Sequence, residues 1–147
     1  PIFRLAIGCA QIKKFPTFVE KRIHNFDRLK AALAGCEDKL ILPEACDNAR
    51  PSWFGFLITC KEGVDRNKVV PYIEAHGVQT RMLFAGNLIK HPCFDQMRAS
   101  GKGYRVIGDL SVTDRVMNNT FWVGVYPGMT DEMIDYMAKT ITEAVNQ

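Results

Sequence analysis

The sequence predicts an α/β or α+β domain in which about three short strands pack against helices. Apolar residues recur at three- and four-residue steps near both ends of the chain, and apolar runs of strand length lie between them. Gly, Pro and Asn residues separate these segments. At 147 residues, 47% of them hydrophobic, the chain suits one domain over 1–147, because such a length buries roughly 70% of its unfolded surface.

The N-terminal part predicts two amphipathic helices, which together cover residues 2–34. Proline is tolerated in the first turn of a helix but breaks its interior, and Pro16 lies between the two apolar patterns. The first helix should therefore end near Lys14, and the second should run from about Pro16 to Ala34 and close at Gly35. The apolar stripes consist of Leu5, Cys9 and Ile12, then Val19, Ile23, Phe26 and Leu33.

Three segments are predicted to be strands. Residues 36–51 lose periodicity and read as a connecting loop. The following run, 52–60, is apolar on both of its alternating faces, which is typical of a central strand covered on both sides. Residues 78–84 and 120–126 are the second and third strands, and the turn Pro127-Gly128 follows the third.

A helix is predicted between the first two strands. Either Asp65 or Asn67 can cap it, and Asn67 is preferred because it leaves Pro71 near the first turn. This helix should continue to Ala75 and end at Gly77.

Further helices are predicted in the second half of the chain. An irregular segment contains a short helix around 94–99, and Ser111 or Thr113 caps another that runs to Asn118. Thr130 caps the last helix. The buried stripe of this last helix is Ile134, Met137, Ile141 and Val145.

Composition excludes several classes of protein. The 19 basic and 16 acidic residues give a net charge of +3, too small for a nucleic-acid-binding protein without a basic stripe. No run reaches the roughly 20 apolar residues of a membrane span, and no secretory signal is present. Five widely spaced cysteines without a C-x-x-C pair indicate reduced thiols and no metal site. A cytoplasmic protein is therefore expected.

Arg81 stands alone in the apolar run 78–84, which makes it the main candidate for binding. A guanidinium offers a planar fork of donors to phosphate or carboxylate oxygens, and Ala85-Gly86-Asn87 lets backbone N–H groups approach a ligand. A structural role is the alternative, in which Arg81 pairs with Asp109 or Asp114. The residues alone leave both interpretations open.

Several segments resemble one protein family in the same order along the chain. They are S52-W-F-G-F56, T80-R-M-L-F-A-G-N87, Y104-R-V-I-G-D-L110, T113-D-R-V-M-N-N-T-F-W122 and G124-V-Y-P-G-M-T130. Together they resemble the C-terminal part of the CDP-4-keto-6-deoxy-D-glucose 3-dehydrases, in the DegT/DnrJ/EryC1/StrS family of sugar aminotransferase relatives. The opening G8-C-A-Q-I-K-K-F-P-T-F-V-E-K-R22 is similar to the helix pair before the small domain. The match covers nearly all of this chain and about the last third of a family member. Residues 1–6 depart from the family's Asn- and Gln-containing segment, so its contribution to the cofactor phosphate is absent or altered.

The resemblance implies the small C-terminal domain of an aspartate aminotransferase-like fold. In the dehydrases, pyridoxamine or pyridoxal phosphate and an iron-sulfur cluster serve the removal of the sugar 3-hydroxyl during lipopolysaccharide biosynthesis. A histidine replaces the usual lysine, a reductase donates electrons, and the enzyme is a homodimer. None of His24, His76 and His91 matches the catalytic histidine, and none of the cysteines matches the cluster pattern. The isolated chain is therefore expected to bind no cofactor and to be inactive alone.

The resemblance also assigns candidate site residues. Arg81, Asn87 and His91 would contact the CDP-sugar substrate, although a loop histidine such as His91 is also compatible with a solvated role. Either Phe54 or Phe56 would lie beside the cofactor, where excluding water protects the reacting group; a core position is the alternative for such aromatics.

Two other functions remain compatible with the sequence. The chain could be a stand-alone interaction domain that kept the fold and lost the chemistry, or a fragment of a related pyridoxal-phosphate-dependent sugar aminotransferase.

Overall fold

A computed structural model describes residues 2–147, with side chains from residue 5 onward. Its centre is a four-stranded antiparallel sheet in the order β1-β2-β4-β3. The strands are β1 (Leu40–Ile41), β2 (Gly55–Cys60), β3 (Thr80–Met82) and β4 (Thr120–Gly124). This mixture of helices and sheet confirms the predicted fold class. Pro1 and the side chains of residues 2–4, which belong to the segment predicted to depart from the family pattern, lie outside the described residues.

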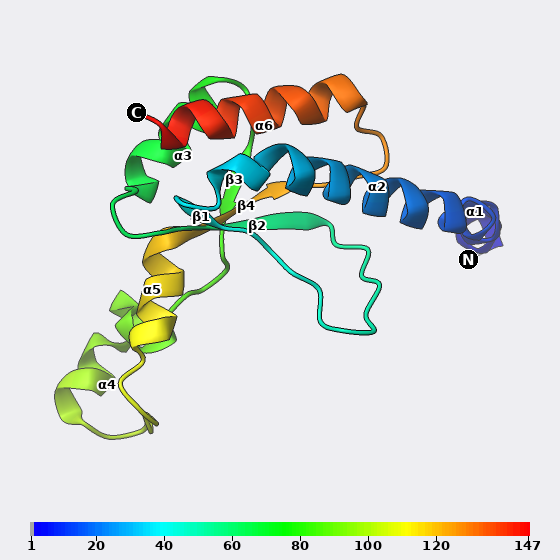
Figure 1. Ribbon diagram of the computed structural model, residues 1–147. Coiled ribbons are helices and arrows are strands. Elements are labelled where there is room, and N and C mark those ends of the chain that lie inside the picture. The colour runs from blue at the N-terminus through cyan, green and yellow to red at the C-terminus, as the bar shows by residue number, and fades with distance from the viewer. Residues whose placement is uncertain (1) are drawn as a thin grey trace.

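The helices divide into a layer on the sheet, a separate lobe and an N-terminal arm. They are α1 (Ile2–Ile12), α2 (Phe15–Leu33), α3 (Arg66–Ala75), α4 (Asp95–Ser100), α5 (Ser111–Asn119) and α6 (Asp131–Val145). Short 3₁₀ turns occupy Ala34–Cys36, Leu88–Lys90 and Pro92–Phe94. Figure 1 shows α2, α3 and α6 on one side of the sheet and the lobe, residues 88–119 with α4 and α5, on the other side.

The core lies between one face of the sheet and the helix layer. Alternation along β2 and β4 directs Phe56, Ile58, Phe121 and Val123 to this face, and each is fully buried. They pack with Leu29 and Leu33 of α2 and with Ile134 and Ile141 of α6, all fully buried as well. Burial of each large apolar side chain contributes about 1.5–3 kcal/mol, so this layer holds the fold together.

The opposite side of the sheet, called the open face below, consists of Ile41, Leu57, Arg81 and Trp122. In register, Leu57 and Arg81 both lie beside Trp122, one on each flanking strand. Ile41 is 46% exposed and Leu57 is 38% exposed. The prediction of a strand covered on both sides is wrong for the described residues, although β2 is central as predicted. The lobe lies on this side of the sheet but leaves Ile41 and Leu57 exposed, which is typical of a surface that packs against something else.

The start of α3 differs from the preferred prediction. Asp65 has an extended backbone, and its carboxylate accepts a hydrogen bond from the backbone N–H of Asn67 at 2.9 Å. Asp65 is therefore the cap, and Pro71 lies inside the helix. The choice of Asn67 was wrong because the carboxylate and the carbonyl oxygen of Asp65 accept the first N–H groups of the helix, which therefore begins at Arg66. Gly77 ends the segment as predicted, with a φ of 78°.

The start of α5 also differs from the prediction. Neither Ser111 nor Thr113 caps it; the N-cap position is Leu110, in the left-handed region with φ 56°. The Asp109 carboxylate accepts a hydrogen bond from the Ser111 N–H at 2.9 Å and so binds the first helical donor from outside the helix. The last helix begins as predicted, because the Thr130 hydroxyl accepts from the Met133 N–H at 3.3 Å.

Strand lengths were less predictable than strand positions. The predicted loop 36–51 contains the two-residue strand β1, which pairs with Thr59 and Cys60. The predicted strand 78–84 is regular only over Thr80–Met82. A two-residue strand is fixed by the neighbour that it pairs with, so its own sequence carries little signal.

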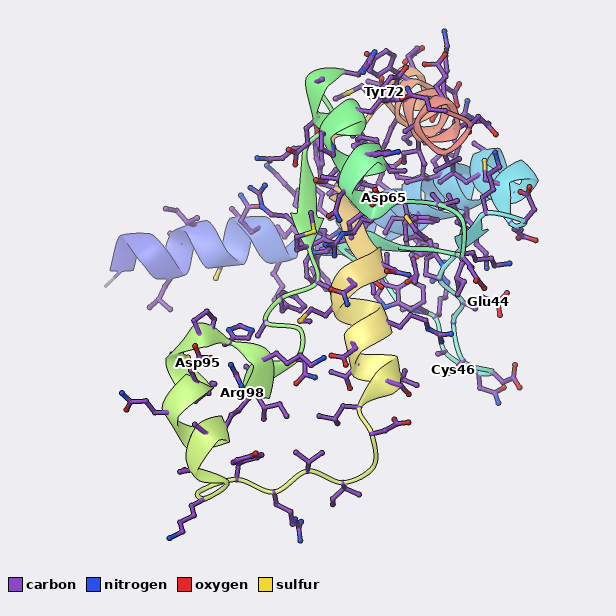
Figure 2. The ribbon with its side chains drawn as sticks, turned by 90° about the vertical axis from the view of Figure 1, so that its left-hand side faces the viewer. Glu44, Cys46, Asp65, Tyr72, Asp95 and Arg98 are labelled. Atoms are coloured by element: carbon purple, nitrogen blue, oxygen red, sulfur yellow. The ribbon has the colours of Figure 1, made fainter. Side chains whose placement is uncertain are left out.

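α1 projects from the body as an arm, visible at the left of Figure 2. Its apolar side chains are exposed: Leu5 is 69% exposed, Ile7 62% and Ile12 71%. The first predicted stripe is thus not buried by the described residues, whereas Phe26 and Leu33 of the second stripe are. Such exposed apolar side chains are typical of a surface that is covered by another body.

Candidate functional site

Arg81 lies on the open face at the sheet edge formed by β3. Its neighbour Thr80 is 2% exposed and faces the helix layer, so alternation turns the arginine side chain to the opposite, exposed side. The guanidinium Nη1 donates to the Thr80 carbonyl oxygen at 2.9 Å. Among the described residues no carboxylate lies within ion-pair distance of Arg81. The cationic group therefore keeps its charge at the surface.

The two carboxylates considered as structural partners of Arg81 have other partners. Asp109 accepts the Ser111 N–H, and this backbone hydrogen bond lowers the pKa of the Asp109 carboxyl. The Asp114 carboxylate lies 2.6 Å from Lys90 Nζ and 2.8 Å from Asn87 Nδ2. These hydrogen bonds, from Lys90 first and then Asn87, lower the pKa of Asp114. The alternative in which Arg81 pairs with Asp109 or Asp114 is therefore not what the structure shows.

An aromatic surface adjoins Arg81 on the open face. Phe54 meets Trp122 edge to face, with ring centroids 5.4 Å apart and an interplanar angle of 90°. The indole lies against the backbone of Gly55, where an added Cβ would sit 2.6 Å from the ring carbon Cε3. The indole Nε1 is buried and has no hydrogen-bond partner among the described residues. Glycine at 55 is thus what allows the Trp122 ring to lie flat on the sheet.

The structure separates the two phenylalanines predicted to lie beside a cofactor. Phe56 is fully buried in the core, with its ring centroid 4.8 Å from that of Phe26. Phe54 is 60% exposed and belongs to the aromatic surface of the open face. Of the two, Phe54 has the ring that a ligand on the open face can touch, and its contact with a cofactor stays a prediction.

Residues 83–87, called the neck below, connect β3 to the lobe. Asn87 lies at the end of the neck, and His91 lies just beyond it in the lobe. Asn87 is 2% exposed; its side chain donates to Asp114, and its backbone N–H points at the Met117 sulfur at 3.3 Å. The His91 imidazole Nε2 is hydrogen-bonded to the Ala85 carbonyl oxygen. Both side chains thus hold the neck together, and substrate contact by either one stays a prediction.

The neck is packed too tightly for a side chain at position 86. Gly86 has a φ of 62°, and a Cβ there would lie 2.5 Å from the Cγ atom of Met117. The close approach of this connecting segment to Met117 of α5 therefore requires glycine at position 86. This packing sets the position at which the lobe leaves the sheet.

Two residues beside Arg81, namely Gln79 and Trp122, were not predicted as site residues from the sequence. With its amide oriented by the hydrogen-bond network, Gln79 accepts from Arg81 Nη2 at 2.9 Å and from Nη1 at 3.0 Å. The signal was available, because residues two apart in a strand share a face, which groups Gln79 with Arg81. Trp122 was predicted only as part of a strand, since its face depends on pairing with β2 and β3.

Arg81 borders a depression of about 390 Å³ that is lined by Glu74, Gly77, Val78, Gln79 and Arg81. Glu74 is the carboxylate of this set, and it accepts a hydrogen bond from the Thr80 hydroxyl at 2.5 Å. It is thereby held on the Thr80 side of the strand. The depression is thus lined by one cation, one carboxylate that is bound to the Thr80 hydroxyl, and a neutral amide.

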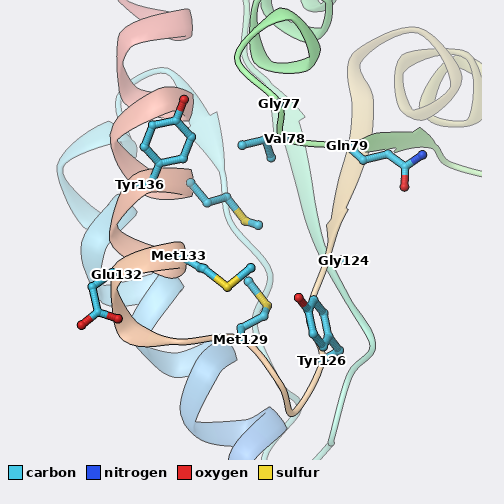
Figure 3. A pocket seen from close by; sticks show the side chains of 10 residues that line it. Gly77, Val78, Gln79, Gly124, Tyr126, Met129, Glu132, Met133 and Tyr136 are labelled. Atoms are coloured by element: carbon cyan, nitrogen blue, oxygen red, sulfur yellow. The ribbon is translucent and has the colours of Figure 1, made fainter.

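A larger cavity, of about 590 Å³, lies between α6 and the start of β3 (Figure 3). Its side chains are mainly apolar: Val78, Tyr126, Met129, Met133, Tyr136 and Met137. The Tyr136 hydroxyl donates to the His76 carbonyl oxygen at 2.9 Å, and Glu132 points outward. Gly77, Val78 and Gln79 line both this cavity and the depression at Arg81, so the two adjoin at the start of β3. The larger cavity lacks the convergent polar groups of a site for a charged substrate.

Two kinds of feature are missing from residues 2–147 as the structure describes them. No group of three or more His, Cys, Asp and Glu side chains is placed to bind a metal ion there. None of the described helices combines the length and apolarity needed to cross a membrane.

Comparison with known proteins identifies the family. The family model described as "DegT/DnrJ/EryC1/StrS aminotransferase family" matches residues 3–142. The chain belongs to the DegT/DnrJ/EryC1/StrS family. The family indicated by the sequence motifs is thereby confirmed.

Two curated proteins match most of the chain. It is 47% identical over 140 residues to the lipopolysaccharide biosynthesis protein RfbH of Salmonella typhimurium, covering 94% of this chain and 31% of the relative. It is 42% identical over 142 residues to a dTDP-4-dehydro-2,6-dideoxy-D-glucose 3-dehydratase of Saccharopolyspora spinosa, covering 95% and 29%. The chain thus spans about a third of the length of the DegT/DnrJ/EryC1/StrS relatives it matches.

Solved structures of DegT/DnrJ/EryC1/StrS-like enzymes share the fold. The chain superposes on Escherichia coli GDP-4-keto-6-deoxy-D-mannose-3-dehydratase with bound hydrated PLP at a TM-score of 0.77 and 25% identity, covering 92% of this chain and 34% of that one. An aminotransferase from Psychrobacter cryohalolentis gives a TM-score of 0.77 at 17% identity, covering 97% and 38%, which supports the fold alone. The predicted aspartate aminotransferase-like fold is confirmed.

Proposed function

We propose that this chain is the C-terminal small domain of a nucleotide-sugar 3-dehydratase that removes the sugar 3-hydroxyl in lipopolysaccharide biosynthesis. The proposed substrate is a CDP-linked 4-keto-6-deoxysugar. The proposal is supported by the relatives, which include RfbH and 3-dehydratases acting on dTDP- and GDP-linked sugars by name. The catalytic base and most of the cofactor site would belong to the remaining two-thirds of the enzyme.

The observation that carries this proposal is the placement of Arg81 on an otherwise apolar, aromatic open face. A guanidinium without a carboxylate partner can bind the diphosphate of a nucleotide-sugar through two parallel charge-assisted hydrogen bonds. The neighbouring Trp122 and Phe54 exclude water from one side, which strengthens these bonds by lowering the local dielectric constant. Arg81 would orient the substrate while the large domain performs the chemistry.

The open face fits one wall of a pyridoxamine phosphate site. Such a cofactor, when bound, supplies the electron sink for loss of the 3-hydroxyl. Phe54 and Trp122 offer flat apolar surfaces suited to a planar ring, and none of the open-face residues is a lysine or histidine that could serve as its base. This chain would therefore shield the reacting group from water, and the base would come from the large domain.

The proposal also includes partners of the whole enzyme. An iron-sulfur cluster in the large domain, fed by a reductase, would supply the electrons that the deoxygenation requires. The enzyme would act as a homodimer. The exposed apolar residues of α1 and of the open face are the surfaces available for covering by the large domain.

Steady-state kinetics of the full-length enzyme tests this function. Arg81→Ala should lower kcat/KM for the nucleotide-sugar by about 10- to 150-fold, since a charge-assisted hydrogen bond contributes about 1.5–3 kcal/mol. Arg115→Ala, which removes an exposed arginine from α5, is the matched control and should leave kcat/KM unchanged. Unchanged kinetics of the Arg81 variant would refute the assigned role of this residue.

A further inference from the structure

The guanidinium of Arg81 is held entirely by neutral oxygen atoms. The Thr80 carbonyl oxygen accepts from Nη1 at 2.9 Å. With the Gln79 amide turned to satisfy its hydrogen-bonding neighbours, the amide oxygen accepts from Nη2 at 2.9 Å and from Nη1 at 3.0 Å. Glu74, the carboxylate in the same depression, is bound to the Thr80 hydroxyl and forms no ion pair with the arginine. An arginine that is fixed in place but not neutralised is suited to binding an anion.

The hydrogen bonds already made determine which donors of Arg81 remain. A guanidinium has five N–H groups in a planar fork, two on each Nη and one on Nε. Both N–H groups of Nη1 are used, one by each acceptor, and one N–H of Nη2 is used by Gln79. The remaining Nε–H and second Nη2–H lie parallel on one edge of the group. This edge is the pair of donors with which arginine binds a phosphate or carboxylate in a bidentate manner.

The hydrogen bonds from Arg81 to the Gln79 amide oxygen are called the clamp below. The neutrality of this amide matters as much as its position. A carboxylate at position 79 would hold the guanidinium equally well, but its charge would cancel the field that attracts a phosphate. An amide oxygen accepts the same two hydrogen bonds and carries no net charge. The free edge therefore stays both oriented and fully cationic.

We propose that Gln79 is the positioning residue for Arg81 and that its neutral amide presents the Nε/Nη2 edge to the diphosphate of the substrate. This inference rests on the proposed function, because it takes Arg81 to be the anion-binding group. Gln79 also lines the methionine-rich cavity, and Figure 3 shows its side chain extending away from α6. Its amide lies within hydrogen-bond distance of the guanidinium.

The clamp itself is tested by nitrogen-15 NMR of the 147-residue chain. Rotation about the Nε–Cζ bond of Arg81 should be slow in the wild type and fast in Gln79→Ala, with the exposed Arg115 as an internal reference for free rotation. If Arg81 rotates as fast as Arg115 in the wild type, the clamp does not exist. This readout is independent of any role in catalysis.

The consequence for binding is tested by kinetics of the full-length enzyme. Gln79→Glu should raise KM for the nucleotide-sugar by about tenfold or more at pH 8, because the new carboxylate pairs with the guanidinium. It should change kcat less, and KM should fall as the pH is lowered toward the pKa of the new carboxyl. Gln79→Ala should raise KM by a smaller factor without this pH dependence. Gln96→Glu, an equal charge change on α4, is the control and should leave KM unchanged.

Two outcomes would separate this inference from the proposed function. If Arg81→Ala raises KM and Gln79→Glu does not, the arginine site stands and the clamp is overturned. If Arg81→Ala leaves KM unchanged, the proposed role of the arginine fails, whereas the NMR measurement still decides whether Gln79 holds the guanidinium.

Discussion

Gly55 and Gly124 face each other across β2 and β4, and the structure predicts opposite effects of the same change at the two positions. An alanine Cβ at 55 would lie 2.6 Å from Trp122 Cε3 and 3.2 Å from Cζ3. Carbon atoms in contact prefer about 3.5–4.0 Å, so the indole would have to move by about 1 Å. At Gly124 nothing lies within 4 Å of the added carbon.

The magnitude follows from comparing the two variants with each other. Neither glycine has a positive φ, so alanine is allowed at both and restricts the unfolded chain equally, by about 0.4–1 kcal/mol. This contribution cancels in the comparison. Overpacking typically costs about 1–3 kcal/mol, and displacing the indole also weakens its edge-to-face contact with Phe54. Gly55→Ala should therefore be less stable than Gly124→Ala by about 1–3 kcal/mol.

Urea unfolding of the 147-residue chain, followed by circular dichroism, measures this difference directly. Thermal unfolding should agree, with a Tm for Gly55→Ala that is lower by about 2–4 °C for each kcal/mol. Tryptophan fluorescence should change in the Gly55 variant and stay constant in the Gly124 variant. Equal free energies of unfolding for the two variants would refute the contact between the Trp122 ring and the β2 backbone.

Two further predictions concern titratable groups. Hydrogen bonds from Lys90 and Asn87 lower the pKa of Asp114 below its usual value of 3.8, so the folded state binds the proton less tightly than the unfolded state. The resulting stabilisation is present above pH 3.8 and is lost as the pH falls through the lowered pKa. In urea titrations from about pH 5 downward, Asp114→Asn should lack this acid-dependent loss of stability. A pH profile identical to that of the wild type would contradict the prediction. Burial raises the pKa of the Cys60 thiol to about 11. A thiol reagent at pH 8 should therefore label the exposed Cys9, Cys46 and Cys93 in the folded chain, and it should label Cys60 only after unfolding. Rapid labelling of Cys60 in the folded chain would contradict its buried position.

Features that depend on a few neighbouring residues were predictable from the sequence. The cap at Thr130 and the stop at Gly77 were found because a hydroxyl before an acidic first turn, and a glycine after a helix, act locally. The strand β1 was missed because Leu40 and Ile41 become extended only by pairing with β2. The position of Arg81 drew attention as a lone charge in an apolar run, since that contrast is visible without any structure.

The surroundings of the candidate site were less predictable. Alternation could have grouped Gln79 with Arg81, but the orientation of the amide depends on the guanidinium it contacts. Phe54 and Phe56 have the same parity, so alternation placed both on one face. Because β2 begins only at Gly55, Phe54 lies outside the regular strand and turns to the open face instead.

The two outer strands of the sheet are very short, with two residues in β1 and three in β3, against six in β2 and five in β4. A long edge with unpaired backbone groups is a template for intermolecular strand addition, and short edges that carry a charged side chain resist such aggregation. Arg81 is the middle residue of β3 and supplies that charge. Removing it also removes a safeguard against fibre-like association, so the particle size of any such variant should be measured before its weaker turnover is ascribed to the substrate.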